Sequence, residues 1–318
     1  MVNIITDLAK YVMIILLAVF MLLGFRLVRG PEEEKRAALW VQDFLLFALH
    51  FTGNAVLFLN TENKELLYFY GMQLLAFLIF LLLQRIVYPR SDKLLNHNLL
   101  LLLSVGLLML SRLSFDRAER QFQIAVLAGG LTFLIPWIIR KAGTLRELYW
   151  VYGAGGLLTL IAVLILGNTA FGARLSLTIY DVTIQPSEFV KILFVFFVAG
   201  MLYETQDLRR VVITTCAAAA HVLVLVLSRD LGGALVFFVT YLVMLYVATK
   251  QPLYFLAGLG AGCAASFVAW RLFSHVQARV LAWSNPFAVI EEEGYQIAQS
   301  LFAIGTGGWF GMGLGQGM

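Results

Sequence analysis

The sequence contains few charged residues. Only 13% of its 318 residues are Asp, Glu, Lys or Arg, whereas 61% are hydrophobic, and the mean hydropathy is +0.85. This composition excludes a soluble globular domain and indicates a protein that crosses a membrane several times. The net charge of +4 therefore indicates basic residues in short loops and not a nucleic-acid partner.

Cysteine and histidine are also scarce. Cys216 and Cys263 both lie in apolar runs, which argues against a disulfide framework. The four histidines are widely separated and lack metal-ligand spacing, so we predict no metal site. The N-terminus has no basic region or small-residue cleavage site, so we expect 11–25 to belong to a membrane span and not to a signal peptide.

What the sequence has instead is a series of apolar runs long enough to cross a bilayer. They predict an all-α polytopic membrane protein with about ten transmembrane helices. The runs lie near 11–29, 39–59, 66–88, 97–111, 121–139, 147–167, 188–203, 211–227, 231–249 and 252–273. The fourth run is short, and we expect its helix to extend at either end.

The distribution of basic residues predicts the orientation. With the N-terminus outside, the cytoplasmic loops receive thirteen of the 23 Lys and Arg residues, including every pair and triplet, as positively charged inner loops require. These residues are Arg26, Arg29, Lys35, Arg36, Arg85, Arg90, Lys93, Arg140, Lys141, Arg146, Arg209, Arg210 and Lys250. Two longer outer segments, 168–187 and 275–318, interrupt the series of short loops.

The heptad Gln185–Lys191 stands at the start of one of the most apolar runs. Glu188 and Lys191 are three residues apart and would share one face of a helix. Charged groups in or near a membrane span usually face a partner, a cavity or a ligand. Two interpretations remain open: a structural ion pair inside the bundle, or part of a functional cavity wall.

Four stretches carry motifs. They are Gly172-Ala173-Arg174 followed by Ile184-Gln185-Pro186-Ser187-Glu188-Phe189-Val190-Lys191; Asp230-Leu231-Gly232; Arg279 with Asn285-Pro286; and Gly294-Tyr295-Gln296, Gln299-Ser300, Ala303-Ile304-Gly305, Gly308 and Gly311 to Gly315. In order, spacing and expected membrane side they resemble the bacterial SEDS family (shape, elongation, division and sporulation), which includes FtsW, RodA and SpoVE. The resemblance covers about 97–318.

The sequence departs from the family pattern in several places. Leu175 replaces a Trp, Ser228-Arg229 replaces Gln-Pro before the Asp, and Gly233 replaces a Thr. Three helices in 1–95 match nothing in the minimal family core. We therefore expect three parts, namely an N-terminal three-helix extension (1–95), a partial SEDS membrane core (96–274) and an extracellular loop with an interfacial helix (275–318).

The resemblance implies a function for the intact protein. SEDS members are peptidoglycan glycosyltransferases of the bacterial cytoplasmic membrane, where they polymerise lipid II in cell division, cell shape or sporulation. Their partners are a class B penicillin-binding transpeptidase and proteins of the divisome or elongasome. The family's catalytic Asp follows the glycine-rich run, so we expect it beyond Met318, with three of ten core helices also missing. We expect 1–318 alone to be inactive.

The resemblance and the outer position of the motifs give a set of candidate substrate residues. We predict that they line a cavity for a lipid-linked pyrophosphate: Arg174, Gln185, Ser187, Glu188, Lys191, Asp230, Arg279, Gln296 and Gln299. Arginine suits bidentate phosphate contacts. Pro186 suits the first turn of a helix whose positive end would face the pyrophosphate. The structural alternatives are a helix cap for Asp230 and solvated or interfacial positions for Arg174 and Arg279.

Two further hypotheses remain open for the whole protein. A lipid flippase would also need buried charge and several helices, and a non-catalytic scaffold for a transpeptidase would tolerate the departures from the motifs. If the intact enzyme uses a cofactor, we expect a divalent cation such as Mg²⁺. For Glu291–Glu293 a solvated acidic turn is favoured over a metal site, because hard-metal sites need convergent oxygens.

Overall fold

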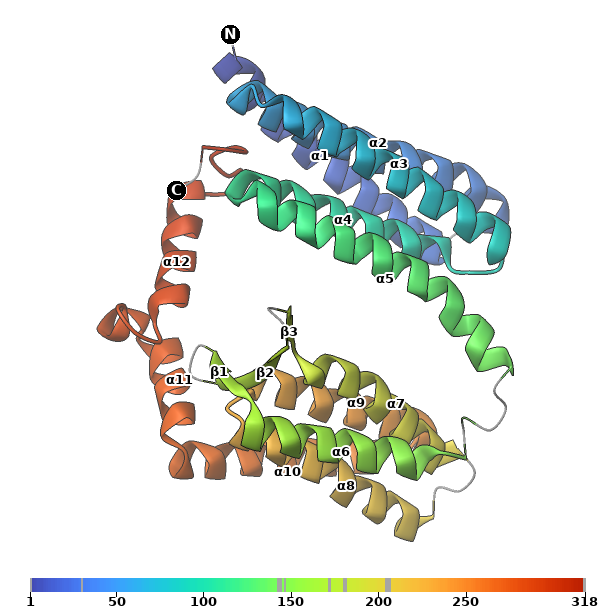
Figure 1. Cartoon of the computed structure of the whole chain (residues 1–318), viewed down its shortest axis with the longest axis vertical. Coiled ribbons are helices and arrows are strands. Elements are labelled where there is room, and N and C mark those ends of the chain that lie inside the picture. Colours follow the sequence, from blue (N-terminus) through green and yellow to red (C-terminus); the bar gives the residue numbers. More distant parts are fainter. Residues whose placement is uncertain are drawn as a thin grey trace. The chain divides into compact units, whose positions relative to one another are not determined.

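The structure is a computed structural model that describes residues 2–29, 31–141, 145, 147–170, 173–179, 182–203 and 207–316. Long helices dominate it (Figure 1). They are α1 (Val2–Arg29), α2 (Glu32–Thr61), α3 (Lys64–Val87), α4 (Lys93–Leu113), α5 (Phe115–Lys141), α6 (Tyr149–Leu166), α7 (Pro186–Tyr203), α8 (Leu208–Leu227), α9 (Leu231–Thr249) and α10 (Pro252–Leu272). Two shorter helices follow, α11 (Ser274–Ser284) and α12 (Tyr295–Gly307), separated by the 3-10 turn η2 (Pro286–Val289).

Ten helices in the described part of the chain are long and apolar enough to cross a membrane, which confirms the predicted spans and the all-α membrane fold. The fourth helix does extend at both ends. Its start is fixed by Asp92, whose Oδ1 accepts a hydrogen bond from the backbone N–H of Leu95 at 3.1 Å. Asn63 caps α3 in the same way through Glu65, at 2.9 Å. Such caps satisfy backbone donors that a helix leaves open at its start.

The segment between α6 and α7 contains three short strands in addition to the helical fold. They are β1 (Asn168–Ala170), β2 (Ala173–Ile179) and β3 (Val182–Ile184), and they pair antiparallel in the order β1-β2-β3. Thr169 lies opposite Arg174, and Leu177 lies opposite Ile184. The sheet therefore leads the chain directly into the first residue of α7.

The chain divides into two compact units. The first consists of Met1–Ile138 with Gln296–Met318, and the second of Ile139–Tyr295. The three-part division expected from the sequence followed the family motifs and not packing, and it stays a prediction.

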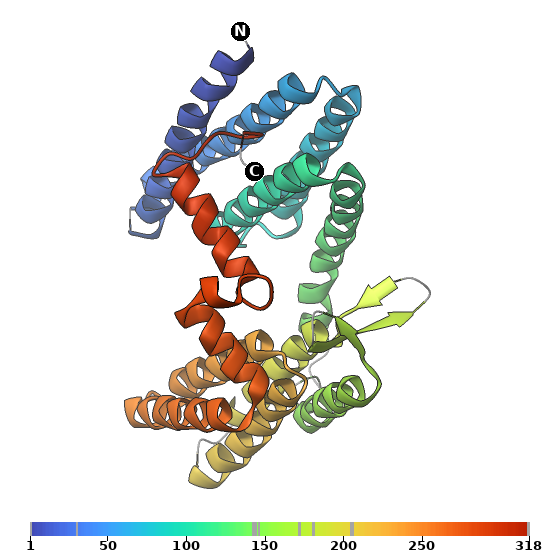
Figure 2. The same cartoon turned by 90° about the vertical axis from the view of Figure 1, so that its left-hand side faces the viewer.

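In the first unit, α2 packs against α1, α3 and α4 around a core that includes Leu46, Phe77 and Leu107. The glycine-rich segment after α12 returns to the first helices (Figure 2). There Asn60 Nδ2 donates to the Leu314 carbonyl at 3.3 Å, and Leu314 packs against a small cluster around Leu57. The residues that bear the last family motif are thus held by helices outside the expected family core.

In the second unit, α6 to α9 enclose a core that contains Phe194, Phe197 and Phe237. Lipid offers no hydrophobic driving force between spanning helices, so close packing of small residues holds them together. A Cβ atom at Gly258 would lie 2.3 Å from Leu242, and one at Gly262 would lie 2.3 Å from Phe238. Glycine at these two positions therefore allows α10 to pack closely against α9.

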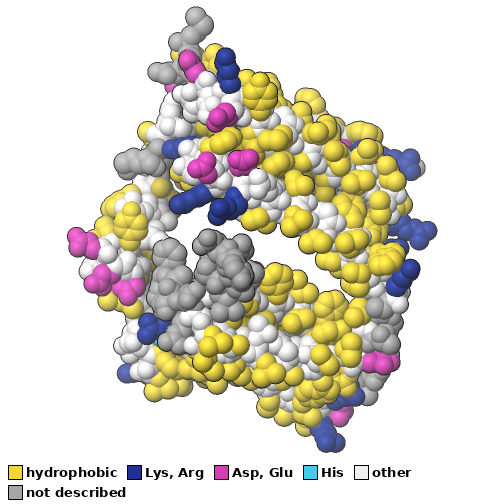
Figure 3. Space-filling model, viewed as in Figure 1, with side chains coloured by type: hydrophobic (Ala, Val, Ile, Leu, Met, Phe, Trp, Pro, Cys, Tyr) yellow, Lys and Arg dark blue, Asp and Glu magenta, His cyan; other side chains and the backbone are white. Residues whose placement is uncertain are grey.

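The surface agrees with a membrane environment. In the view of Figure 3, hydrophobic side chains cover the helix faces, and charged groups gather towards helix ends. No residue in the 18-residue windows of α5 and α10 is buried, among those that the structure describes. Such apolar, uncovered helices are expected where lipid is the solvent.

Candidate functional site

The helices α6 to α10 alternate in direction, so several connections of the second unit lie at one end of its bundle. We call this the motif end, comprising the described residues 168–170, 173–179, 182–191, 228–233 and 273–279. Six predicted substrate residues with described side chains belong to it: Gln185, Ser187, Glu188, Lys191, Asp230 and Arg279. Three of the four family motifs therefore meet at one end of a single unit.

The first part of the motif end is the start of α7. This helix begins at Pro186, as predicted, because proline supplies a suitable φ and needs no N–H partner at that position. Gln185 Nε2 donates to Ser187 Oγ at 3.1 Å. Lys191 Nζ donates to both carboxylate oxygens of Glu188 at 2.8 Å.

The exposure of the Glu188–Lys191 pair bears on its role. The Glu188 side chain is 57% exposed and that of Lys191 is 32% exposed, so the pair lies at the surface of the unit rather than in its core. An exposed pair contributes about 0–1 kcal/mol to stability. The Glu188–Lys191 ion pair therefore adds little to the stability of the bundle. A ligand can reach both charged groups from the solvent.

The turn between α8 and α9 forms the second part. Asp230 Oδ1 accepts from the backbone N–H of Gly233 at 2.8 Å, so Asp230 does cap α9. A Cβ atom at residue 233 would lie 2.5 Å from Asp230 Oδ2, which explains why glycine suits this chain where the family pattern has Thr. The preceding Arg229 has φ +64°.

The left-handed backbone at Arg229 separates this turn from the family pattern. Proline fixes φ near about −65°, so the proline of the family motif could not adopt the conformation that Arg229 has here. Non-glycine residues in this region store strain and cluster at functional sites. The Arg229 side chain is exposed and adds a cation beside Asp230.

The third part is the start of α11. Arg229 and Arg279 both act on His275, and together with burial they hold the pKa of this histidine below its usual value; burial is the largest cause. A hydrogen bond to the Val226 backbone works in the opposite direction. Arg229 lies directly before Asp230 at the start of α9, and Arg279 lies in α11, so both belong to the motif end. Sequence reasoning passed over His275, because an isolated histidine outside any metal spacing gave no signal.

The remaining predicted residues lie apart from this group or outside the described side chains. The backbone of Arg174 lies in β2, and its side chain is outside the described residues. Gln296 and Gln299 lie on α12, within the segment 275–318 where a helix was expected, and both are exposed. They belong to the first unit. Glu291–Glu293 form an exposed turn.

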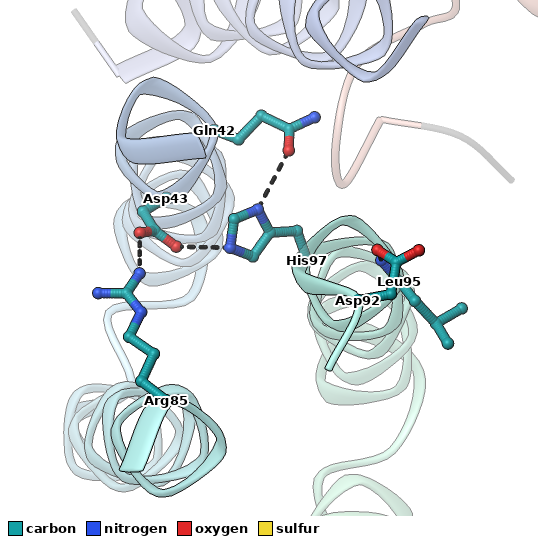
Figure 4. A network of polar contacts seen from close by, with 6 residues as sticks. All are labelled: Gln42, Asp43, Arg85, Asp92, Leu95 and His97. Carbon is teal, nitrogen blue, oxygen red and sulfur yellow. Dashed lines mark hydrogen bonds and ion pairs between the residues drawn. The ribbon is translucent and has the colours of Figure 1, made fainter. Parts of the chain in front are cut away.

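The structure also contains a polar network in the first unit that sequence reasoning missed (Figure 4). Asp43 of α2 forms an ion pair with Arg85 of α3, and its Oδ1 lies 2.9 Å from His97 Nε2 of α4. His97 Nδ1 lies 3.1 Å from Gln42 Oε1, and Gln42 Nε2 donates to the Phe20 carbonyl at 3.2 Å. A lone Asp within the run 39–59 was the available signal, since buried intramembrane charge is rare.

A second missed residue is His221 in the core of the second unit. It is 1% exposed, its Nδ1 lies 2.8 Å from the Ala217 carbonyl, and its ring contacts Phe194, Phe197 and Phe237. Its position deep among aromatic rings separates it from the motif end. We therefore assign it to packing.

Comparison with known proteins identifies relatives. The family model described as cell cycle protein, for FtsW, RodA and SpoVE, matches residues 92–318. The peptidoglycan glycosyltransferase RodA of Mycobacterium tuberculosis is 31% identical over 258 residues, covering 72% of this chain and 55% of the relative. The probable peptidoglycan glycosyltransferase FtsW of Alteromonas naphthalenivorans is 32% identical over 235 residues, covering 68% of this chain and 45% of the relative.

The chain thus spans about half the length of the curated relatives it matches. No solved structure matches it significantly. The family match begins within residues 88–93, the polar break before α4, and contains every motif residue named above.

Proposed function

This chain belongs to the FtsW, RodA and SpoVE family of cell cycle proteins, and we propose that the whole protein is a peptidoglycan glycosyltransferase that polymerises lipid II. It is a multi-pass protein of the cytoplasmic membrane, with ten apolar helices in the described residues. We further propose that the N-terminus and the motif end face the outside, as the distribution of Lys and Arg favours.

The observation that carries the proposal is the gathering of family motif residues at the motif end. The start of α7 presents the positive end of its helix dipole there, together with Lys191. Arg229 and Arg279 are two exposed cations that also belong to the motif end. A pyrophosphate at the membrane interface needs such cations, because its charge is only partly solvated beside lipid.

The chemistry assigns different tasks to these groups. In the proposed reaction, the hydroxyl oxygen of the acceptor sugar bonds to the anomeric carbon of the donor with inversion, and the bond from that carbon to the pyrophosphate oxygen breaks. The hydroxyl proton goes to a general base, which the family resemblance supplies as an aspartate. Undecaprenyl pyrophosphate leaves with the bonding electrons, and Arg229 and Arg279 offset its charge.

The proposed substrate residues are those of the motif end together with Arg174, Gln296 and Gln299. A class B penicillin-binding transpeptidase is the proposed protein partner, with divisome or elongasome proteins around it. Among the described residues, no three His, Cys, Asp or Glu side chains lie together where they could hold a metal ion. A divalent cation such as Mg²⁺ belongs to the proposal for the whole protein only, where it would help to offset the pyrophosphate charge.

Two other functions predict different outcomes. A flippase would use the same charges to move lipid II across the membrane without joining sugars. A scaffold would bind a transpeptidase and need none of the charges. The motif end favours the polymerase, because its polar groups gather at one end of the bundle, whereas a flippase needs access from both.

The test uses the full-length protein with Lys191→Gln, in assays that separate lipid II polymerisation from lipid II flipping. A charged hydrogen bond contributes about 1.5–3 kcal/mol, so we expect polymerisation to fall roughly 10-fold to 150-fold. Thermal unfolding should change little, since the Glu188–Lys191 pair is exposed. Lys250→Gln is the matched control, because Lys250 ends α9 at the opposite end of the bundle.

Each outcome selects one function. Loss of polymerisation in Lys191→Gln alone supports the polymerase. Loss of flipping with intact polymerisation would indicate a flippase. Unchanged activity in both assays would remove Lys191 from any substrate role, and a lack of polymerisation by the unmodified full-length protein would leave the scaffold.

A further inference from the structure

A recess opens in the first unit where α3 ends and α4 begins. It holds about 250 Å³ of empty space, part of it open to the surface. The polar residues that line it are Gln84, Arg85, Ser91, Lys93, Asn96 and His97. Leu81 and Tyr88 complete the lining, and no Asp or Glu is among the described residues that form it. We call it the basic recess.

The charge of the basic recess follows from the network behind it. Asp43 is the carboxylate of that network, and it contacts both Arg85 and His97 (Figure 4). It lies behind the recess lining, with its side chain 11% exposed, whereas the Arg85 side chain is 35% exposed. The Arg85 side chain is therefore paired with Asp43 and is still partly open to the surface.

His97 links the recess to this network. Its Nε2 lies 2.9 Å from a carboxylate oxygen, and its Nδ1 lies 3.1 Å from Gln42 Oε1. The amide of Gln42 is oriented by its own donation to the Phe20 carbonyl. Both ring nitrogens of His97 therefore face oxygen atoms of α2.

Arg85 is one cation of the recess, and Lys93 at the rim is a second. Lys93 is exposed and is the first residue of α4, where the positive end of the helix dipole lies. With Asp43 counted, Arg85 and Lys93 leave a net charge of about +1. Ser91 and Asn96 add neutral hydrogen-bonding groups to the same wall.

The geometry points to a phosphate site: we propose that the basic recess binds a phosphate group, carried either by the head group of an anionic lipid or by a soluble phosphate. The lining offers cationic side chains and neutral hydrogen-bonding groups, which are the groups that bind a phosphate. The recess joins the ends of two spanning helices, and basic pockets at such ends bind anionic lipid head groups. It is separate from the motif end and independent of the proposed polymerase activity.

The test compares the purified full chain with Lys93→Gln by native mass spectrometry. The probes are phosphatidylglycerol, phosphatidylcholine and inorganic phosphate. One lysine near a lipid surface changes anionic binding about fivefold, so we expect Lys93→Gln to lose about that factor in its preference for phosphatidylglycerol. Lys64→Gln is the matched control, because Lys64 is the exposed first residue of α3 after a capping Asn63.

A second readout reports on the recess itself. The Arg85 guanidinium lies over the Trp40 ring, 4.7 Å from its centroid. A phosphate that binds Arg85 should change the fluorescence of Trp40. The Trp40→Phe variant shows how much of the measured fluorescence change comes from this tryptophan. Lys93→Gln should retain the unligated spectrum and the unfolding temperature, since Lys93 is exposed.

The probes distinguish the sources. A preference for phosphatidylglycerol that Lys93→Gln weakens and Lys64→Gln keeps supports a lipid head group. A fluorescence change with inorganic phosphate but not with phosphatidylglycerol supports a soluble phosphate. The proposal is overturned if Lys93→Gln and Lys64→Gln bind phosphatidylglycerol equally well, or if Trp40 fluorescence responds to none of the probes.

Discussion

The buried network of the first unit gives the sharpest stability prediction, which concerns Asp43→Asn. The substitution keeps the shape of the side chain and removes its charge. Arg85 then loses its carboxylate partner, and His97 loses the charged oxygen that faces its Nε2. Removing one member of a buried ion pair leaves the other charge uncompensated, and this costs about 3–5 kcal/mol in buried sites.

The exposures of Arg85 and His97 set the magnitude. The Arg85 side chain is 35% exposed and can turn to water, so its share is that of a surface pair, about 0–1 kcal/mol. The His97 side chain is 2% exposed and cannot be hydrated, so it contributes most of the cost. We expect Asp43→Asn to lower the free energy of unfolding by about 3 kcal/mol, near the lower end of the range for buried pairs.

The assay is equilibrium unfolding in mixed detergent micelles, with Asp207→Asn as the matched control. Asp207 is exposed and its side chain makes no capping hydrogen bond, so its variant should stay within about 0.5 kcal/mol of the parent. The double variant Asp43→Asn with His97→Gln should lose less than the sum of the single losses, because the two residues are in contact. A loss for Asp43→Asn as small as that of the control would refute the energetic role of the network.

Two further predictions concern the second unit. Gly153→Ala should lower its stability by about 1–3 kcal/mol, because the new Cβ would lie 2.6 Å from the Phe197 ring; Gly155→Ala, with nothing within 4 Å, should instead stabilise, and the same sign for both in thermal unfolding would contradict this. His275 has a lowered pKa in the folded state, so the unfolded chain binds its proton more readily and stability is lost as pH falls below about 6.5. Unfolding temperatures at pH 7 and pH 5 should show a slightly smaller loss for His275→Gln than for the parent; an equal or larger loss would contradict the stated shift.

Much of the fold could be predicted because lipid leaves few choices to the backbone. Each span must satisfy its own hydrogen bonds, so apolar length alone located the ten helices. The caps and helix starts were local as well: Pro186 begins α7 and Asp230 caps α9. Such features depend on neighbouring residues and can be inferred without tertiary structure.

The sheet was missed although the sequence contained a signal for it. In β2, Leu175, Leu177 and Ile179 alternate with polar residues, which is the period of a strand. The segment was treated as a connection because the rest of the chain is helical. Strand pairing also requires partners, and β1 and β3 have three residues each, too few to stand out alone.

The network around Asp43 could not be predicted in the same way. Its members come from α2, α3 and α4, and only the packing of these helices brings Asp43, Arg85 and His97 together. The sequence offers one isolated acid and two basic residues that fit the ordinary pattern of helix ends. The partners of a buried charge are a property of tertiary structure.

The return of the glycine-rich segment to the first helices has a consequence for how the chain is made. Asn60 meets Leu314 across 254 residues, and Asp7 accepts from Gln316 at 3.3 Å across 309 residues. During synthesis α1 and α2 enter the membrane first. The side chains of Asp7 and Asn60 therefore lack these partners until the residues after α12 have been synthesised. Closing so long a loop carries a large entropic cost, which must be met before the contacts form. The first helices thus act as a template on which the final family motif is assembled.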